Sequence, residues 1–489
     1  MNYKLQTFRG FARIANLCLK RREPNILEYQ KQPKRLTTSL IIFIFIGLSV
    51  MFSSTNLQGQ GLPKTLAEVA KLAASDRASD DDFGYSVAIS GNYAIVGTYQ
   101  ESEDASGANT LTLAGSAYIF ERDANGAWTE VQKIVASDRA ASDYFGYSVA
   151  IHGNYAVVGA HGDTERTGSV HVYKRNANGE WLYHQKLEAF IGKHDDEHFG
   201  YSVAIHGDYI FASALTDRLD EVKFEKIAGS VMIYKKDAND QWNGVQRIRS
   251  SDIAIGDYFG SSIAADGDFV VVGARFEDQD AADANTITSA GAAYIFKVDV
   301  NGNWNEIQKI VPSHRAHSNK IGHSLDISGD YIVLGSENKT DADNLNPLGG
   351  NGSAFVFKKG AGDVWTEVQK LKPSNGKSSS HFGFDAVSIS GDYIAVGAKN
   401  IDLLENNVWH GGLVYMYKVD GDGNWNETQI VKAENTSNFG LGISLRPSNI
   451  LIIYCHDICS PFTIKTYGTH LLVHAYSYCY FSCSRSCCW

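Results

Sequence analysis

Cysteine is missing from the long middle of the chain. The sequence has 489 residues and 7 cysteines, yet residues 61–445 contain none of them. A stretch of this length without cysteine must be stabilised by packing, and this excludes a disulfide-stapled domain. Proline is also scarce, with 8 residues, whereas glycine is abundant, with 46. That balance favours many short strands joined by tight turns.

Long apolar runs are missing too. The apolar run at 40–52, LIIFIFIGLSVMF, is shorter than the roughly 20 residues that a bilayer-spanning helix needs. It follows Lys34 and Arg35 and precedes small and polar residues, which is the order of a secretory signal. Residues 1–60 are therefore predicted to be a leader that carries either a signal peptide or an uncleaved signal anchor. The expected location is secreted or at the cell surface.

Positive charge is scarce between the two ends. Residues 61–445 hold 32 Lys and Arg against 52 Asp and Glu, a net charge of −20, while both ends are basic. So acidic a domain repels nucleic acid and anionic membrane surfaces. We therefore expect no nucleic-acid partner, and a membrane association only through an uncleaved anchor. The charge fits cation binding, or simply the solubility of an exported protein.

A repeat of about sixty residues dominates the chain. The spacing between successive Phe-Gly pairs, with one Ile-Gly in the series, is 62, 54, 60, 62, 61 and 57 residues. The pairs begin at Phe83, Phe145, Phe199, Phe259, Ile321, Phe382 and Phe439. So even a period indicates a repeat architecture in which each unit is one structural element.

Each unit predicts four short antiparallel strands. In the second unit the strand candidates are DYFGYSVAI, YAVVGA, GSVHVYKR and WLYHQKLEA, separated by Asn- and Gly-rich turns. Asx-Gly turns between β-rich runs are hairpin signals. YAVVGA is apolar on both faces, as expected for a strand covered on both sides. The predicted fold is all-β: a β-propeller of four-stranded blades over residues 61–445.

The two ends of the propeller are predicted to share a seventh blade. The segment Leu66–Asp76 matches the fourth strand at Trp128–Asp138, and an orphan first strand lies at 439–444. Joining them would close the ring and hide an edge. The blade is incomplete in the sequence, because 446–489 shows no repeat feature and holds six of the cysteines. That tail is either a frameshifted end or a genuine cysteine-rich segment.

These motifs resemble those of a known repeat family. The FG pair, the G-[DN]-Y turn, the VGA strand and the Gly-Ser/Ala-aromatic third strand are similar to the FG-GAP repeats of integrin α subunits and many bacterial surface proteins. The resemblance spans roughly 62–445 and implies a seven-bladed propeller outside the cytoplasm, used for binding or adhesion. The proline of the family's Gly-Ala-Pro element is absent here, and no loop has the full calcium pattern of integrin-like blades.

Calcium is the metal that the acidic loops between the second and third strands suggest. Calcium prefers several oxygen ligands on a flexible loop. The alternative interpretation is a solvated acidic loop. The candidate ligands are Asp278, Asp280, Asp283, Asp341 and Asp343.

Residues of catalytic type recur with the repeat and are therefore assigned to the blades. No serine stands in a G-x-S-x-G elbow. The tryptophan that opens each fourth strand, as Trp128 does, is assigned to packing. The aspartates before the FG pairs, such as Asp143 and Asp257, are assigned to the turn. We predict no enzyme activity and no catalytic residue.

Three functions remain open. The leading one is a binding module whose loops contact an extracellular protein or glycan, since ligand sites on such scaffolds lie on loops. The second is an extracellular polysaccharide hydrolase or lyase, which an asymmetric pocket of His, Asp and Tyr would favour. The third is a passive role in a surface assembly.

Overall fold

The computed structural model describes most of the repeat region. The described residues are 72–76, 78, 81–191, 195–219, 227–282, 285–337, 352–375, 381–403, 408–432, 441–446, 449–454 and 464–468. The chain divides into two compact units, 1–62 and 63–489, and every described residue belongs to the second. The predicted leader therefore lies outside the described residues. In the described part, no helix is both long and apolar enough to cross a membrane.

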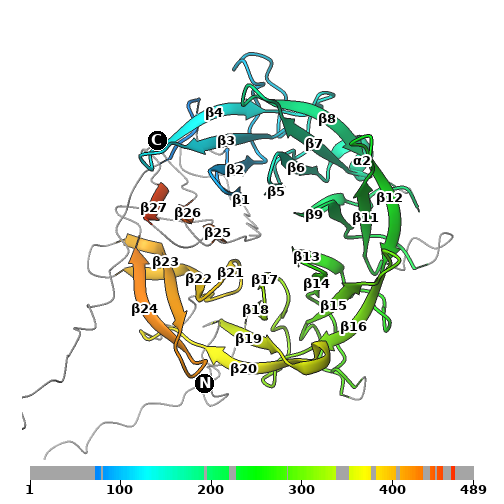
Figure 1. The fold of residues 1–489 in the computed structure, drawn as a ribbon, viewed down its shortest axis with the longest axis vertical. Helices are drawn as coiled ribbons and strands as arrows, with labels where there is room; N and C mark the ends of the chain where they lie inside the picture. The colour runs from blue at the N-terminus through cyan, green and yellow to red at the C-terminus, as the bar shows by residue number, and fades with distance from the viewer. Residues whose placement is uncertain are drawn as a thin grey trace, which may run out of the picture. The chain divides into compact units, whose positions relative to one another are not determined.

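Six four-stranded antiparallel sheets form the blades of a propeller, with their first strands inside and their fourth strands at the rim (Figure 1). The first blade is β1 (Ser86–Ser90), β2 (Tyr93–Thr98), β3 (Ser116–Arg122) and β4 (Trp128–Ile134). The next three blades are β5 (Ser148–His152), β6 (Tyr155–Ala160), β7 (Ser169–Arg175), β8 (Trp181–Leu187); β9 (Phe199–His206), β10 (Tyr209–Ala214), β11 (Ser230–Lys236), β12 (Trp242–Ile248); and β13 (Phe259–Asp266), β14 (Phe269–Ala274), β15 (Ala292–Val298), β16 (Trp304–Ile310). The fifth and sixth are β17 (Leu325–Ser328), β18 (Tyr331–Ser336), β19 (Ser353–Lys359), β20 (Trp365–Leu371); and β21 (Val387–Ser390), β22 (Tyr393–Leu403), β23 (Val408–Val419), β24 (Trp425–Lys432). Two short turns, α2 (Asp163–Arg166) and η1 (Ala361–Asp363), are the helical pieces of this part.

The predicted seventh blade differs from the expectation. The structure describes six four-stranded blades and a separate three-stranded sheet. That sheet is β25 (Leu441–Arg446), β26 (Asn449–Tyr454) and β27 (Ile464–Gly468). The expectation of seven four-stranded blades therefore needs correction: apolar runs of the non-repeat tail pair with β25, whereas most of Leu66–Asp76 lies outside the described residues.

The FG pair joins each blade to the one before it. Phe145 is fully buried among residues of the first and second blades, and its N–H donates to Ala114 O at 3.0 Å. Gly146 has φ +91°, and a Cβ there would lie 2.2 Å from Ser116 O on β3. Only glycine combines that backbone with so close an approach. The FG spacing is therefore the spacing of blade-to-blade contacts.

The core lies between the blades. Five of the apolar clusters among the described residues combine residues of two neighbouring blades; one example contains Ile95 of β2 and Val158 of β6. The tryptophan that opens a fourth strand packs edge-on against the aromatic ring that opens the second strand of the preceding blade, as Trp181 does on Tyr93 at 5.6 Å.

One extra residue, Val131 in β4, bulges from the ladder between Glu130 and Gln132. Such a bulge re-aims the side chains beside it.

Candidate functional site

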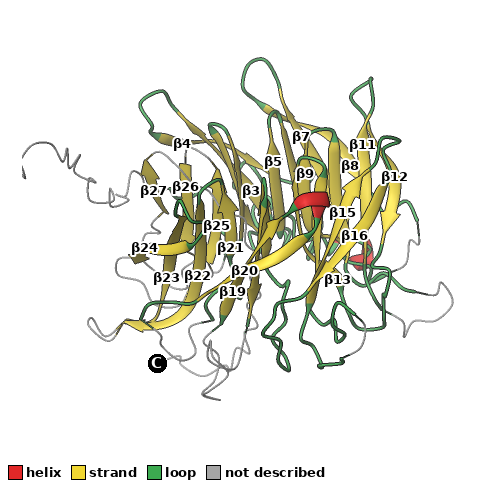
Figure 2. Ribbon diagram, turned by 60° about the horizontal axis from the view of Figure 1, so that its bottom comes forward, coloured by secondary structure: helices red, strands yellow, loops and turns green. Residues whose placement is uncertain are grey.

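The two ends of the propeller are built differently. Side-on, short hairpin turns occupy one end of the blades and longer loops the other (Figure 2). At the loop end the first strand begins and the second strand ends, because the two strands pair antiparallel, as β5 and β6 do. We call this loop end of the central channel the mouth. Each unit therefore brings its FG pair and its second-strand exit to the mouth.

One mouth position adopts a left-handed backbone in every described blade. It is the residue just before the Phe or Ile of the motif, and its φ lies between +47° and +55°. The left-handed region disfavours side chains other than glycine by about 1–2 kcal/mol. Yet this position carries large or charged residues in all six blades: Asp82, Tyr144, His198, Tyr258, Lys320 and His381. A strained backbone that keeps bulky side chains is a sign of a functional site.

Two further positions of each unit lie at the mouth, and they also vary from blade to blade. The first follows the glycine of the motif and is Tyr85, Tyr147, Tyr201, Ser261, His323 and Phe384 in successive blades. The second follows the second strand and is Tyr99, His161, Leu215, Arg275 and Glu337 in the first five. The three places together are the mouth positions. The repeat fixes where they lie, and their identities differ around the ring.

A cavity of about 640 Å³ opens at the mouth. Its described lining comes from the second to the sixth blade, and all but Thr216 and Phe276 stand at mouth positions. We call it the mouth cavity. None of the described lining residues is acidic, although the domain is strongly acidic. The lining combines aromatic rings, imidazoles and two cationic side chains.

His161 lies in the middle of an aromatic group. Its ring stacks on Tyr144 at 5.2 Å and on His198 at 5.4 Å, and it meets the edge of Tyr147 at 4.2 Å. Burial among these rings lowers the pKa of His161 to about 3, and burial also lowers the pKa of His198. Both imidazoles are therefore neutral at physiological pH. The Nδ1 atom of His161 is buried without a hydrogen-bond partner in the described structure.

Two cations face the same cavity. Arg275 is only 9% exposed; its Cζ atom lies 5.0 Å from the centre of the Phe276 ring and 5.6 Å from that of Tyr258. One of its nitrogens donates to the Tyr201 hydroxyl at 3.3 Å. Lys320 pairs with Glu337 at 2.6 Å. Arg275 is thus a positive group held by aromatic rings, a favourable arrangement in a desolvated site.

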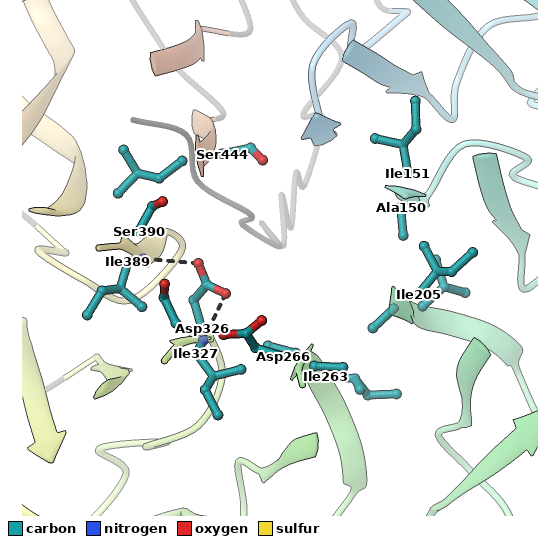
Figure 3. A pocket seen from close by; sticks show the side chains of 16 residues that line it. Ala150, Ile151, Ile205, Ile263, Asp266, Asp326, Ile327, Ile389, Ser390 and Ser444 are labelled. Carbon is teal, nitrogen blue, oxygen red and sulfur yellow. Dashed lines mark hydrogen bonds between the residues drawn. The ribbon is translucent and has the colours of Figure 1, made fainter. Parts of the chain in front are cut away.

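The opposite end of the channel is narrower and repetitive. A cavity of about 190 Å³ there is lined by the ends of the first strands (Figure 3). Isoleucine recurs around it, as at Ile151, Ile205 and Ile327. Asp326 accepts the N–H groups of Ile327 and Ile389 at 2.9 and 3.0 Å, which joins neighbouring first strands. The residues at this end therefore serve to pack the blades together.

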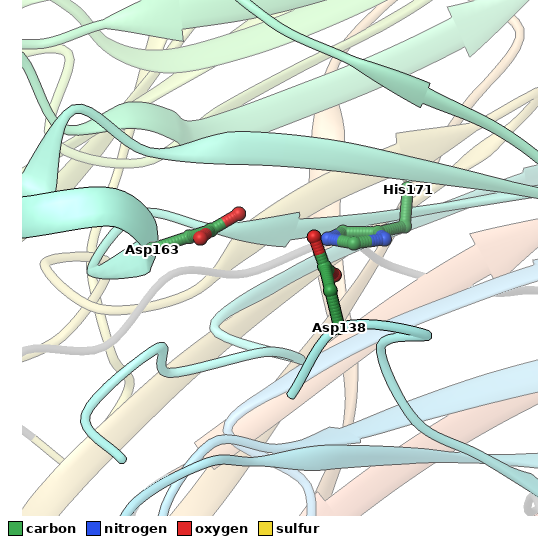
Figure 4. A group of neighbouring side chains, drawn as sticks. All are labelled: Asp138, Asp163 and His171. Atoms are coloured by element: carbon green, nitrogen blue, oxygen red, sulfur yellow. The ribbon is translucent and has the colours of Figure 1, made fainter. Parts of the chain in front are cut away.

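One group of metal-ligand type occurs among the described residues: Asp138, Asp163 and His171, whose ligand atoms lie within 4.8 Å of one another (Figure 4). However, the Lys186 ammonium already bridges Asp138 and Asp163, at 2.5 and 2.6 Å. In the first blade, Lys133 pairs in the same way with Asp76 and Glu101. The group is therefore one copy of an ion pair that recurs among blades. His171 is the feature that distinguishes this group from the ion pair of the first blade.

The predicted calcium ligands are only partly described. Asp278 accepts the Ser289 N–H at 2.5 Å and Asp280 accepts the Ala282 N–H at 3.0 Å, so both carboxylates bond within their own loop. Asp283, Asp341 and Asp343 lie outside the described residues. The calcium site stays a prediction.

The structural assignments of the other recurring residues are confirmed. The tryptophans that open the fourth strands are buried, from 1% exposure at Trp181 to 8% at Trp128. The Ser148 hydroxyl donates to Gly200 O of the next blade at 2.7 Å. Asp143 is buried and accepts the Ala140 N–H at 2.6 Å. Burial raises the pKa of Asp143 to about 6.

Sequence reasoning missed the mouth cavity. Its histidines stand far apart in the sequence, as His161 and His381 do, and no local motif connects them. A signal was nevertheless present. When the units are aligned on the FG pair, the flanking positions change chemistry from unit to unit, whereas the pair itself persists.

The match to a family model agrees with this architecture. The family model of the FG-GAP repeat matches residues 66–120, 128–173, 242–296, 304–357 and 365–417, together more than half of the chain. No curated protein matches. Among solved structures, the periplasmic gluconolactonase PpgL of Pseudomonas aeruginosa is similar with 15% identity and a TM-score of 0.42, over 76% of this chain and 88% of that one. So distant a likeness says nothing of activity here. The five family matches, in register with the blades, show that the chain belongs to the FG-GAP repeat family.

Proposed function

We propose that the protein is a binding module, active outside the cytoplasm, that recognises a glycan at the mouth cavity. One observation carries the proposal. In all six described blades the backbone before the motif stays left-handed, yet it carries Tyr, His, Lys or Asp instead of glycine. Backbone strain that persists in every blade indicates that the side chains at this position have a role at the mouth.

The chemistry of the cavity favours a sugar over a flat protein surface. Small ligands bind in concave sites of about 300–1,000 Å³, and the mouth cavity has about 640 Å³. Tyr147, Tyr201 and Tyr258 offer flat rings against which the apolar face of a sugar can pack. Neutral histidines and tyrosine hydroxyls offer donors and acceptors for sugar hydroxyl groups.

Mutation of the lining tests this function. Binding of the full chain to a glycan array should disappear in the Tyr147→Ala and Tyr201→Ala variants. Tyr183→Ala is the control for a tyrosine away from the cavity, because Tyr183 lies on the outer strand β8 and is 47% exposed. Since Tyr147 and Tyr201 are buried, at 7% and 4% exposure, the Tm of each variant is measured as well to show that it folds. Equal loss in all three variants, or no binding by the wild type, would contradict the proposal. The latter result would leave the passive structural role.

Catalysis on polysaccharide is the second candidate function, and the asymmetry of the mouth cavity favours it. Glycoside hydrolysis generally uses a pair of carboxylates, and none of the described lining residues is acidic. A lyase instead needs a base and a cation that stabilises a carboxylate. Arg275 suits the second role, and His161 is the candidate for the first, although burial lowers its pKa to about 3 and makes it a weak base. An ultraviolet signal of unsaturated sugar, lost in His161→Ala, would favour the lyase. Intact glycan after prolonged incubation favours pure binding.

We further propose that the segment Leu66–Asp76, of which the structure describes 72–76, shares a seventh blade with the β25–β27 sheet. Ser75 bonds twice to Glu130, both at 2.8 Å, as Ser251 does to Glu306 in a complete blade. Residues 72–76 thus resemble the exit of a fourth strand. Removal of residues 1–71 should lower the Tm, whereas removal of 1–60 should not. An equal Tm for the two would contradict the closure.

A further inference from the structure

We propose that the mouth cavity selects an oligosaccharide that carries an acidic group, a carboxylate or a sulfate ester, and that Arg275 is the residue that recognises it. The inference rests on the proposed glycan function and names the class of sugar.

The charge of the cavity runs against that of the domain. Residues 61–445 carry a net charge of −20, but the described lining of the cavity includes Arg275 and Lys320 and no carboxylate. The acidic residue Glu337 stands at a mouth position but outside the lining, where it pairs with Lys320. Because Glu337 balances Lys320, Arg275 is the cation of the lining that would attract an anionic ligand in this negative domain.

Arg275 is prepared for such a ligand. Arg275 is 9% exposed, at a position that holds leucine in the preceding blade. Aromatic contacts with Tyr201, Tyr258 and Phe276 fix the direction of the group. Arginine is also the side chain that binds carboxylate or sulfate through two parallel hydrogen bonds. A guanidinium held in one direction by these rings suits the recognition of an acidic group.

His161 supplies a neutral contact beside this charge. Its imidazole is kept uncharged by burial, and its Nδ1 atom lacks a partner in the described structure. A neutral imidazole donates one hydrogen bond and accepts another, which suits a sugar hydroxyl. The cavity thus pairs one charge-recognising group with neutral polar groups and rings. An acidic peptide would use the charge of Arg275 but would not need the neutral polar groups and the rings.

The experiment compares an acidic sugar with its uncharged ester and with two other acidic ligands. Isothermal titration of the full chain would use a trigalacturonate, its methyl ester, a sulfated neutral trisaccharide and a tetraglutamate peptide. The acidic sugar should bind roughly tenfold to a hundredfold more tightly than the ester, and added salt should weaken only the acidic ligands. The sulfated sugar shows whether carboxylate is required or any acidic group suffices.

Variants locate the effect. Arg275→Gln should make the trigalacturonate and its ester bind equally, while Arg275→Lys should keep part of the preference. Arg122→Gln is the control: it removes the same charge at the opposite end of the blades, where β3 ends. If Arg275→Gln lowers the Tm too far, the wild-type comparison of acid and ester still decides.

Three outcomes overturn the inference. Equal binding of acid and ester by the wild type would exclude selection of acidic groups and leave the glycan function intact. Tetraglutamate that binds as tightly as trigalacturonate would replace the sugar by an acidic protein. No binding of any sugar, charged or neutral, would remove the glycan function itself.

Discussion

The side chain of Gln246 on β12 bonds twice to the main chain of Trp304 on β16. Its amide nitrogen donates to Trp304 O and its oxygen accepts the Trp304 N–H, both at 2.8 Å. The same pair of bonds joins Gln132 to Trp181 and Gln308 to Trp365. Each rim strand is thereby connected to the next, beyond the apolar contacts deeper in the blades.

Gln246→Ala should destabilise the propeller. The substitution leaves the Trp304 N–H and C=O without these partners, which costs about 1–3 kcal/mol when the groups are shielded from water. Thermal and denaturant unfolding monitored by tryptophan fluorescence would measure the loss. Gln241→Ala serves as the control, because Gln241 lies in an exposed turn where its side chain makes one long bond of 3.4 Å. Similar destabilisation by both variants would contradict the role given to the rim pairing.

Gly146→Ala should cost more than Gly179→Ala, although the two glycines have nearly the same backbone. Their φ values are +91° and +89°. The left-handed backbone costs alanine about 1–2 kcal/mol at either site. At Gly146 the new Cβ would also meet Ser116 O at 2.2 Å, whereas nothing lies within 4 Å at Gly179. We expect a total of about 3 kcal/mol or more at Gly146. Equal losses of unfolding free energy would show that the blade contact is unimportant.

The buried Asp143 should make the protein less stable as the pH rises. Burial raises its pKa from 3.8 to about 6, so the folded state binds the proton more tightly than the unfolded state does. The stabilisation is complete below about pH 4 and is lost as the pH rises through 6. Asp143→Asn, which keeps an oxygen for the Ala140 N–H, should raise the stability at pH 8 by about 2 kcal/mol. At pH 4 the variant and the wild type should unfold alike; a constant difference at both pH values would contradict this origin.

Lys186→Ala should create a zinc-responsive site. Removal of the ammonium leaves Asp138, Asp163 and His171 around an empty position, and zinc accepts nitrogen and oxygen ligands. Without metal, the variant should lose about 3 kcal/mol of stability because Asp163 loses its partner. Zinc should restore the Tm of the variant and leave the wild type unchanged.

Lys309→Ala is the matched control for that experiment. Lys309 pairs with Asp252 and Glu277 in the fourth blade, but Tyr294 stands where the second blade has His171. Zinc should therefore not restore its Tm. Zinc rescue of both variants would mean that the histidine is irrelevant.

The parts predicted from the sequence are those that depend on local pattern. The strands, their order in a blade and the packing role of Trp181 follow from the repeat itself. The predicted seventh blade did not emerge as expected, because the strands that pair with β25 come from a tail without repeat features. The mouth cavity depends on convergence of residues as distant as Tyr147 and Phe384. The left-handed backbone at Tyr144 or His198 was equally hidden, since neither is a glycine.

The mouth positions are only partly separate from the residues that hold the blades together. The rim pairing, the FG contact and the clusters between neighbouring blades use one set of places in each unit, whereas Tyr85, Tyr147, Tyr201 and Leu215 at the mouth form an apolar cluster of their own. A substitution at Arg275 or His161, which lie outside that cluster, should leave the joints between blades in place. Duplication of a unit would copy the contacts between blades together with three further mouth positions whose side chains can change. Such a scaffold can evolve new specificities one blade at a time.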